Sequence, residues 1–151
     1  MEIGGTIGDY QNVLFLEAAR MLKIKSPEDV LFVMVSYLPV PGTLGEMKTR
    51  PTQNAVHQLN GYGIQPDFIV ARSTLPLDSK RKEKIAMMCN VQPEHVISAP
   101  DIESVYDVPI NFERDKLGEQ LLKALELRPK TKAKHDGLAP WRAFVARTKS
   151  S

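Results

Sequence analysis

The sequence predicts an α/β fold, a parallel sheet whose strands are joined by crossover helices. Short apolar runs rich in β-branched residues occur at residues 30–35, 68–71 and 96–98, and such runs are typical of strands buried on both faces. The segments between them carry apolar residues every three or four positions, the period of one helical face. Strands that alternate with helices pair in parallel, so both observations favour the same fold class.

The first predicted helix, residues 10–22, precedes the first strand and ends before the Ser26-Pro27 pair. Its inner face is expected to hold apolar side chains at three- and four-residue steps, namely Phe15, Ala18 or Ala19, and Leu22. A second helix is predicted over residues 51–60, because Pro51 is tolerated in a first helical turn and two glycines follow the helix.

A third helix is predicted to begin at Asp78 or Ser79, either of which can cap it, and to run to about residue 90. We expect its inner face to contain Ile85, Met88 and Cys89. A leucine repeat predicts a closing helix, with Leu117, Leu121, Leu122 and Leu125 on one side. One domain is expected, the α/β unit of residues 1–128. Residues 129–151 are expected to form a basic linker followed by a short helix with Trp141, Phe144 and Val145 on one side.

Composition narrows the possible functions. A chain of 151 residues with 42% hydrophobic and 25% charged residues suits one core of ordinary size. The net charge of +2 is too small to indicate nucleic-acid binding. Cys89 is the single cysteine, which excludes an intramolecular disulfide or a multi-cysteine metal site. No apolar run approaches the roughly 20 residues of a membrane span, so we expect a soluble, cytoplasmic protein that does not bind membranes.

Two segments could bind phosphate. The turn with Gly4, Gly5 and Gly8 could direct backbone N–H groups at an anion, or it could simply be a tight connection to a helix, since it lacks a P-loop ending. Glu2 and Asp9 beside it could hold magnesium or act as ordinary caps.

The segment from Lys48 to Gln53 indicates anion binding more specifically. Cations and hydroxyls precede and begin a helix, where the free N–H groups already favour an anion. A polyphosphate suits this arrangement, and a solvated loop with a capping threonine is the alternative. The basic run of Lys80, Arg81, Lys82 and Lys84 is typical of a solvated helix face. The three histidines have no metal-ligand spacing, and Cys89 is expected in the core.

Several stretches resemble the synthetase (amidoligase) domain of CTP synthase. Their order matches that domain over nearly the whole chain, and the tail around Trp141 is similar to the stretch that leads to its glutaminase domain. The matching stretches are EIGGTIGD at residues 2–9, FLEAAR at 15–20, GEMKTRPTQ at 45–53, GIQPD at 63–67, KIAMMCNV at 84–91 and VISAPDIESVYDVP at 96–109. The resemblance implies a fragment of a P-loop NTPase-like (dethiobiotin synthetase-like) fold.

The resemblance also implies a function and its residues. The family makes CTP from UTP, ATP and ammonia, the ammonia coming from glutamine in a fused domain, with Mg²⁺ as metal cofactor. UTP/CTP-binding positions are Asp9, Tyr10, Gln11, Lys48, Thr49, Arg50, Pro51, Thr52, Gln53 and Lys84, with the triphosphate bound across a tetramer interface. Pro100, Asp101 and Ile102 fall at the ATP adenine contact, and Glu2 matches a magnesium-binding acid.

The chain departs from the usual sequence of the family at three places. Asp9-Tyr10-Gln11 replaces the usual Asp-Ile-Glu, which removes a carboxylate from the site where the family binds CTP in feedback inhibition. Arg50 stands where lysine is usual, and the two cations differ in geometry. Asn54 and Ala55 replace a His-Ser pair.

The resemblance places the family's ATP loop before Glu2 and its glutaminase domain after Ser151, so the isolated chain is expected not to make CTP. Without preceding strands the sheet is expected to have an exposed edge. Two interpretations stay open. The chain is part of a CTP synthase whose other parts are supplied elsewhere, with a homo-oligomer as the complete enzyme, or it is a non-catalytic module that binds UTP or CTP or modulates the assembly of a synthase.

Overall fold

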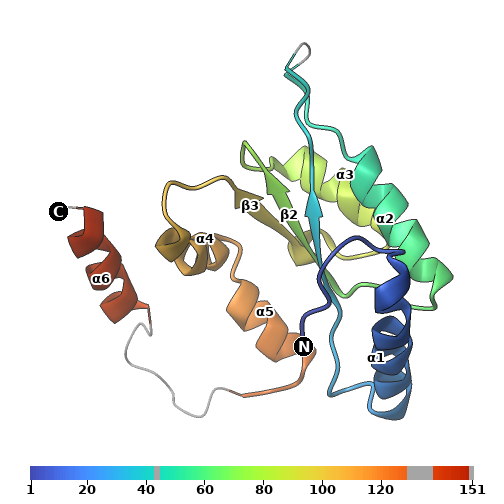
Figure 1. Ribbon diagram of the computed structural model, residues 1–151. Coiled ribbons are helices and arrows are strands. Elements are labelled where there is room, and N and C mark those ends of the chain that lie inside the picture. Colours follow the sequence, from blue (N-terminus) through green and yellow to red (C-terminus); the bar gives the residue numbers. More distant parts are fainter. Residues whose placement is uncertain (43–44, 129–137, 150–151) are drawn as a thin grey trace.

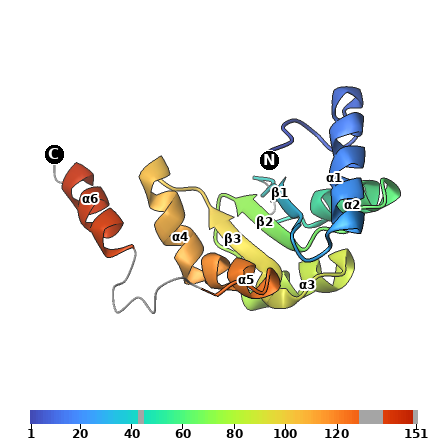
Figure 2. The same cartoon turned by 90° about the horizontal axis from the view of Figure 1, so that it is seen from below.

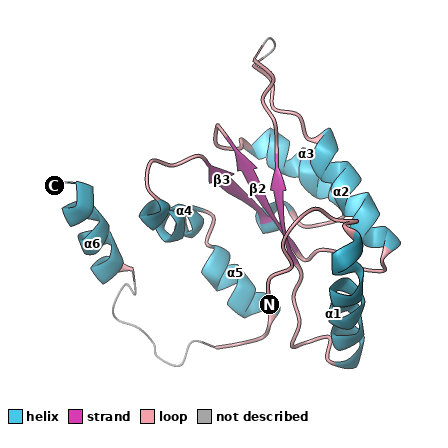
Figure 3. Ribbon diagram, in the orientation of Figure 1, coloured by secondary structure: helices cyan, strands magenta, loops and turns pink. Residues whose placement is uncertain are grey.

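A three-stranded parallel sheet forms the centre of the molecule, as the sequence predicts. The computed structural model describes residues 1–42, 45–128 and 138–149. The strands β1 (Val33–Tyr37), β2 (Phe68–Ser73) and β3 (Val96–Pro100) lie side by side in the order β1-β2-β3. Their register pairs Val35 with Val70, and Val70 with Ile97. Figure 1 shows β2 between the two outer strands, and Figure 3 separates the strands from the helices around them.

Helices cover both faces of this sheet. The crossover helices α2 (Arg50–Gly61) and α3 (Ser79–Cys89) pack with α1 (Val13–Lys25) on one face. On the other face, α4 (Val108–Arg114) and α5 (Leu117–Ala124) lie over β2 and β3. Figure 2 shows the two groups of helices on opposite sides of the strands.

Two apolar clusters hold these layers together, and alternate residues of β2 and β3 point to opposite clusters. The first joins α1, α2 and α3 to the sheet and includes Val56, Ile69, Ile85 and Val96. The second joins α5 to the sheet and consists of Phe68, Val70, Ile97 and Leu117. Alternation therefore accounts for the continuous apolar sequence of β2, which is covered on both sides.

The predictions for α2 and α3 are confirmed. Pro51 lies in the first turn of α2. Asp78 caps α3 by accepting a hydrogen bond from the backbone N–H of Arg81 at 2.7 Å. The α3 helix ends at Asn90, which has a left-handed φ of 54°, and asparagine tolerates that conformation better than most residues. Ile85 and Cys89 are buried as expected, whereas Met88 is exposed and Ala86 takes its place in the core.

The predicted inner face of the first helix is confirmed at Ala19 but wrong at Phe15 and Leu22. A short 3₁₀ turn, η1 (Tyr10–Asn12), precedes α1, and the side chains buried in α1 are Leu16 and Ala19. Phe15 and Leu22 are 56% and 55% exposed. Apolar residues surround most of this helix, so several faces satisfy the helical period and the sequence pattern does not select among them.

The expectation that residues 30–35 are buried on both faces is also wrong. β1 begins at Val33, and Met34 packs in the first cluster. Val33 and Val35 point the other way and are exposed, Val35 by 63%. The cover from α4 and α5 lies over β2 and β3, so this face of β1 is open. β1 is also an edge strand of the described sheet, whose order is β1-β2-β3.

The closing helix that the leucine repeat predicts is confirmed as α5, with Leu117 buried. α4 precedes it and is a helix that the leucine pattern does not show, and Lys116, whose φ is 53°, lies between the two. The last helix, α6 (Ala139–Lys149), is confirmed, with Val145 buried and Trp141 and Phe144 against Tyr106. Most of the predicted linker lies outside the described residues. No helix in the described ranges is long and apolar enough to cross a membrane.

Candidate anion-binding site

A cavity of about 280 Å³ lies between the start of α2 and the outer side of α3, and we call it the α2–α3 cavity. Both helices follow strands, so the cavity belongs to the carboxyl-terminal side of the parallel sheet, where such folds bind ligands. Its lining comes from two separate stretches of sequence: Glu46, Met47, Lys48, Thr49, Arg50 and Gln53 before and within α2, and Lys84 and Met88 from α3. The structure thus brings Lys84 together with the Lys48–Gln53 segment.

The segment leading into α2 sets the direction of the charged side chains. Met47 is buried in the core, and its neighbours Glu46 and Lys48 point outward on the same side, since residues i and i+2 of an extended chain share a face. The backbone N–H of Lys48 donates to the carbonyl of Pro39 at 2.9 Å, and this bond holds the segment against the residues that follow β1. Glu46 and Lys48 form an ion pair with 2.7 Å between Oε2 and Nζ.

The start of α2 has no side-chain cap. Thr49 occupies the cap position without accepting a hydrogen bond from the first turn. Its hydroxyl instead accepts one from Gln53 Nε2 at 3.1 Å, which holds both side chains at the cavity wall. The N–H groups and positive dipole end of the first turn favour an anion, and here they have cationic side chains beside them.

Glu46 lines the cavity, and the cations around it shift the pKa of its carboxyl. The ammonium of Lys48, through a hydrogen bond and its charge, lowers the pKa of the Glu46 carboxyl, and the charges of Lys84 and Arg81 contribute further. One carboxylate therefore lies within the field of three cations, Lys48 from the segment before α2 and Arg81 and Lys84 from α3. Sequence reasoning did not select Glu46 as a site residue, although it belongs to the GEMKTRPTQ stretch and its charge opposes the cations around it.

Two residues of the predicted segment do not line the cavity. Thr52 is fully buried, and its hydroxyl lies 2.8 Å from that of Ser36 in β1. Pro51 is exposed and has no N–H to donate. Both residues help to build α2, whereas Lys48, Thr49, Arg50, Gln53 and Lys84 face the cavity.

The glycine turn forms a separate feature. Asp9 accepts a hydrogen bond from the backbone N–H of Thr6 at 2.8 Å, and Asn12 donates to the carbonyl of Gly4 at 2.6 Å. Gly8 has a φ of 101° and leaves no room for a Cβ beside Gln58 of α2. Tyr10 is 93% exposed and Gln11 is exposed. Asp9, Tyr10 and Gln11 are not part of the cavity lining.

The predicted metal and ATP positions also lie apart from the cavity lining. Glu2 is exposed, and no cluster of three or more potential ligand side chains is found within residues 1–42, 45–128 and 138–149. Within these residues Glu2 therefore lacks the further ligands that would complete a magnesium site. Pro100 is the last residue of β3, and Asp101 and Ile102 follow it. The backbone N–H of Asp101 donates to the carbonyl of Ser73 at 2.8 Å.

Cys89 is a core residue, as predicted. It is 1% exposed, and burial raises the pKa of its thiol to about 11. A thiol that keeps its proton at neutral pH is a poor nucleophile.

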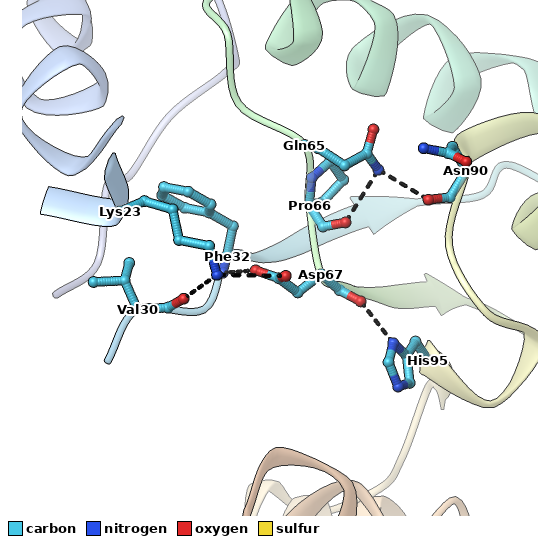
Figure 4. Close-up of polar contacts among 8 residues, drawn as sticks. All are labelled: Lys23, Val30, Phe32, Gln65, Pro66, Asp67, Asn90 and His95. Carbon is cyan, nitrogen blue, oxygen red and sulfur yellow. Dashed lines mark hydrogen bonds and ion pairs between the residues drawn. The ribbon is translucent and has the colours of Figure 1, made fainter. Parts of the chain in front are cut away.

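The GIQPD stretch ties the elements together at the opposite, amino-terminal ends of the strands (Figure 4). We call Gln65, Asp67 and His95 the amino-end clamp. Gln65 Nε2 donates to the carbonyls of Cys89 at 2.9 Å and Asn90 at 3.2 Å, at the end of α3. Asp67 Oδ2 accepts from the backbone N–H of Phe32 at 2.7 Å, and its carbonyl accepts from His95 Nδ1 at 3.0 Å. His95 also stacks on Phe68, with 4.2 Å between ring centroids, so its role here is structural.

Sequence comparison gives the same family as the resemblance. A family model described as the CTP synthase N-terminus matches residues 1–127. A CTP synthase from Methanococcus maripaludis is 45% identical over 148 residues, which are 97% of this chain and 27% of that protein. One from Caldanaerobacter subterraneus is 45% identical over 150 residues, and one from Sulfolobus acidocaldarius is 40% identical over 150 residues. The chain spans about 27% of the length of the relatives it matches.

Proposed function

This chain belongs to the CTP synthase family, and we propose that it supplies the nucleotide triphosphate-binding surface of an enzyme that aminates UTP to CTP. The observation that carries the proposal is the convergence of Lys48, Arg50 and Lys84 on one cavity at the uncapped start of α2. A triphosphate needs several cations and N–H donors from more than one loop, and this arrangement offers them.

The proposed site divides the work among different donors. Lys48 and Lys84 present flexible point charges, and Arg50 offers a planar fork that can contact two phosphate oxygens at once. The first-turn N–H groups of α2 can hold another oxygen without a further side chain. In the proposed reaction, ATP phosphorylates the 4-oxygen of uracil and ammonia displaces that phosphate. The cavity residues take no part in these bond changes but hold the UTP triphosphate and thereby position its base.

We assign residues 1–128 to the second half of the synthetase domain, with a P-loop NTPase-like fold. The ATP-binding loop and the glutaminase domain are then contributed by the remaining length of a complete synthase. Pro100, Asp101 and Ile102 would contact the adenine of ATP from the end of β3. Glu2 would supply one magnesium ligand, the others coming from outside the described residues, because the ligand set here is incomplete.

We further propose that the complete enzyme is a homo-oligomer. Leu14, Phe15, Met21 and Leu22 make an exposed apolar side of α1, and an exposed group of this kind is typical of an interaction surface. The proposed UTP/CTP-binding residues Asp9, Tyr10 and Gln11 precede this helix and are separate from the cavity. A second subunit packed against α1 would allow one nucleotide to contact both regions.

The binding proposal is tested by titrating the chain with UTP and with uridine. UTP is expected to bind far more tightly, because the phosphates supply the charge. Lys48→Ala is expected to weaken UTP binding by tenfold or more, as a charge-assisted hydrogen bond is worth about 1.5–3 kcal/mol. Lys25→Ala, which removes an equally charged exposed lysine in the last turn of α1, is the control. Equal affinities for the wild-type chain and Lys48→Ala would contradict the proposal.

The catalytic part of the proposal needs a complete synthase. Residues 1–128 can replace the matched segment of the Methanococcus maripaludis enzyme, and CTP formation from UTP, ATP and glutamine is then measured. We expect activity, and a lower activity at limiting UTP when the chimera carries Lys48→Ala. A chimera that folds and hydrolyses glutamine but forms no CTP would show that this segment does not support amination.

A further inference from the structure

We propose that Glu46 is an internal competitor for the anion site. Its carboxylate forms an ion pair with Lys48 in the ligand-free chain, and an anionic ligand must break this ion pair in order to bind Lys48. This inference rests on the proposed function of the α2–α3 cavity and adds a residue that regulates the affinity of the same site.

The carboxylate of Glu46 lies where an oxygen of a bound anion would contact Lys48. Its carboxylate oxygen lies 2.7 Å from Lys48 Nζ, the distance of a charge-assisted hydrogen bond. It lines the cavity beside Arg50 and Lys84, the other cations proposed to hold phosphate. A phosphate oxygen that contacts Lys48 in the same way would need the space and the charge that the carboxylate now uses.

The surroundings of Glu46 permit it to leave. Its side chain is 60% exposed, so no core contact is lost when it moves away. Gly45 precedes it with a φ of 59°, and nothing lies within 4 Å of the place that a Cβ on Gly45 would occupy. Met47 follows it and is anchored in the core. Rotation at the side chain of Glu46 and adjustment at Gly45 can therefore release Lys48 while Met47 keeps the segment in place.

The energetic consequence is a reduced apparent affinity. A ligand that binds only when Lys48 is released binds more weakly by the fraction of molecules in that state. After displacement, the carboxylate remains near a polyanion and repels it. Removing the negative charge of Glu46 should therefore increase affinity for a polyphosphate, which is the opposite of the effect expected for a residue that contacts the ligand favourably.

The experiment uses inorganic triphosphate as the probe and compares the wild-type chain with Glu46→Gln by calorimetry. We expect the Kd of the variant to be about two- to fivefold lower, the range expected from an exposed ion pair, and the difference to shrink at high salt. Glu94→Gln is the matched control, since it removes one exposed carboxylate that lines a different cavity. Its Kd should equal that of the wild type.

Four comparisons decide the result. If Glu46→Gln binds triphosphate no more tightly than the wild type, Glu46 is not a competitor, and weaker binding would make it a favourable ligand contact. If Glu94→Gln gives the same gain as Glu46→Gln, the effect is one of net charge and the inference also fails. Lys48→Ala separates this outcome from a failure of the site: when Lys48→Ala loses binding, the cavity assignment stands whatever Glu46 does. In the Lys48→Ala background, Glu46→Gln should give a smaller gain.

Discussion

The two ends of the sheet use their polar residues in different ways. At the amino-terminal ends of the strands, Gln65 and Asp67 form hydrogen bonds with backbone groups. Asp67 accepts one from the N–H of Phe32, just before β1, and Gln65 donates to carbonyls at the end of α3. At the carboxyl-terminal side, Lys48, Arg50 and Lys84 face an open cavity, and Glu46 is the internal partner of Lys48. Both ends belong to stretches that resemble the same family, so the resemblance alone does not tell structure from function.

The comparison shows how hydrogen-bonding partners distinguish the two roles. A polar group whose partners are backbone groups of the same chain stabilises the fold, because its loss leaves those backbone groups without a partner. A charged group that faces a cavity adds little to stability and keeps its interactions for a ligand. We therefore expect substitutions at the clamp to change unfolding and substitutions at the cavity to change binding.

The largest expected effect is on stability, at Asp67. Asp67→Ala removes the acceptor of the Phe32 N–H and the charge 3.8 Å from Lys23 Nζ. We expect the free energy of unfolding, measured in urea, to fall by about 2 kcal/mol, as for a hydrogen bond to a charged group. Asp29→Ala, at an exposed aspartate in the preceding turn, is the control and should change it little. An equal loss in both variants would remove the distinction between the two ends.

The next effect is on binding, at Lys84. Lys84→Ala is expected to weaken the binding of inorganic triphosphate about tenfold, because one of the converging cations is lost. The free energy of unfolding should stay within about 0.5 kcal/mol of the wild type. Lys80→Ala removes the same charge from an exposed position one turn earlier in α3, outside the cavity lining. If it weakens binding as much as Lys84→Ala, the cavity provides only a diffuse positive field.

The smallest effect is at Gln65. Gln65→Ala removes the amide that holds the carbonyls at the end of α3, and we expect a loss of about 1 kcal/mol in the free energy of unfolding. Triphosphate affinity should not change, because Gln65 is not part of the cavity lining. Gln92→Ala, at an exposed glutamine without a side-chain cap bond, is the control. A loss of affinity without a loss of stability would place Gln65 with the binding residues.

Much of the site was predictable because it depends on chain order. Residues that follow parallel strands meet on one side of the sheet, so the juxtaposition of Lys84 with the Lys48–Gln53 segment agrees with the α/β pattern and the resemblance. The division within that segment was not predictable. Thr52 turns to Ser36 while Gln53 turns to Thr49 at the cavity wall, and this choice depends on which side of α2 packs on β1.

Local pattern determined the alternation of α1, α2 and α3 with the three strands and the place where α3 begins, because these follow from spacing and from the chemistry of single residues. Tertiary packing decided which side of α1 is buried and that Val35 is exposed. The physical reason is that an apolar residue can be buried only where another element covers it. Leu16 and Phe15 are equally apolar neighbours, and the position of the sheet, which lies far along the chain, selects between them.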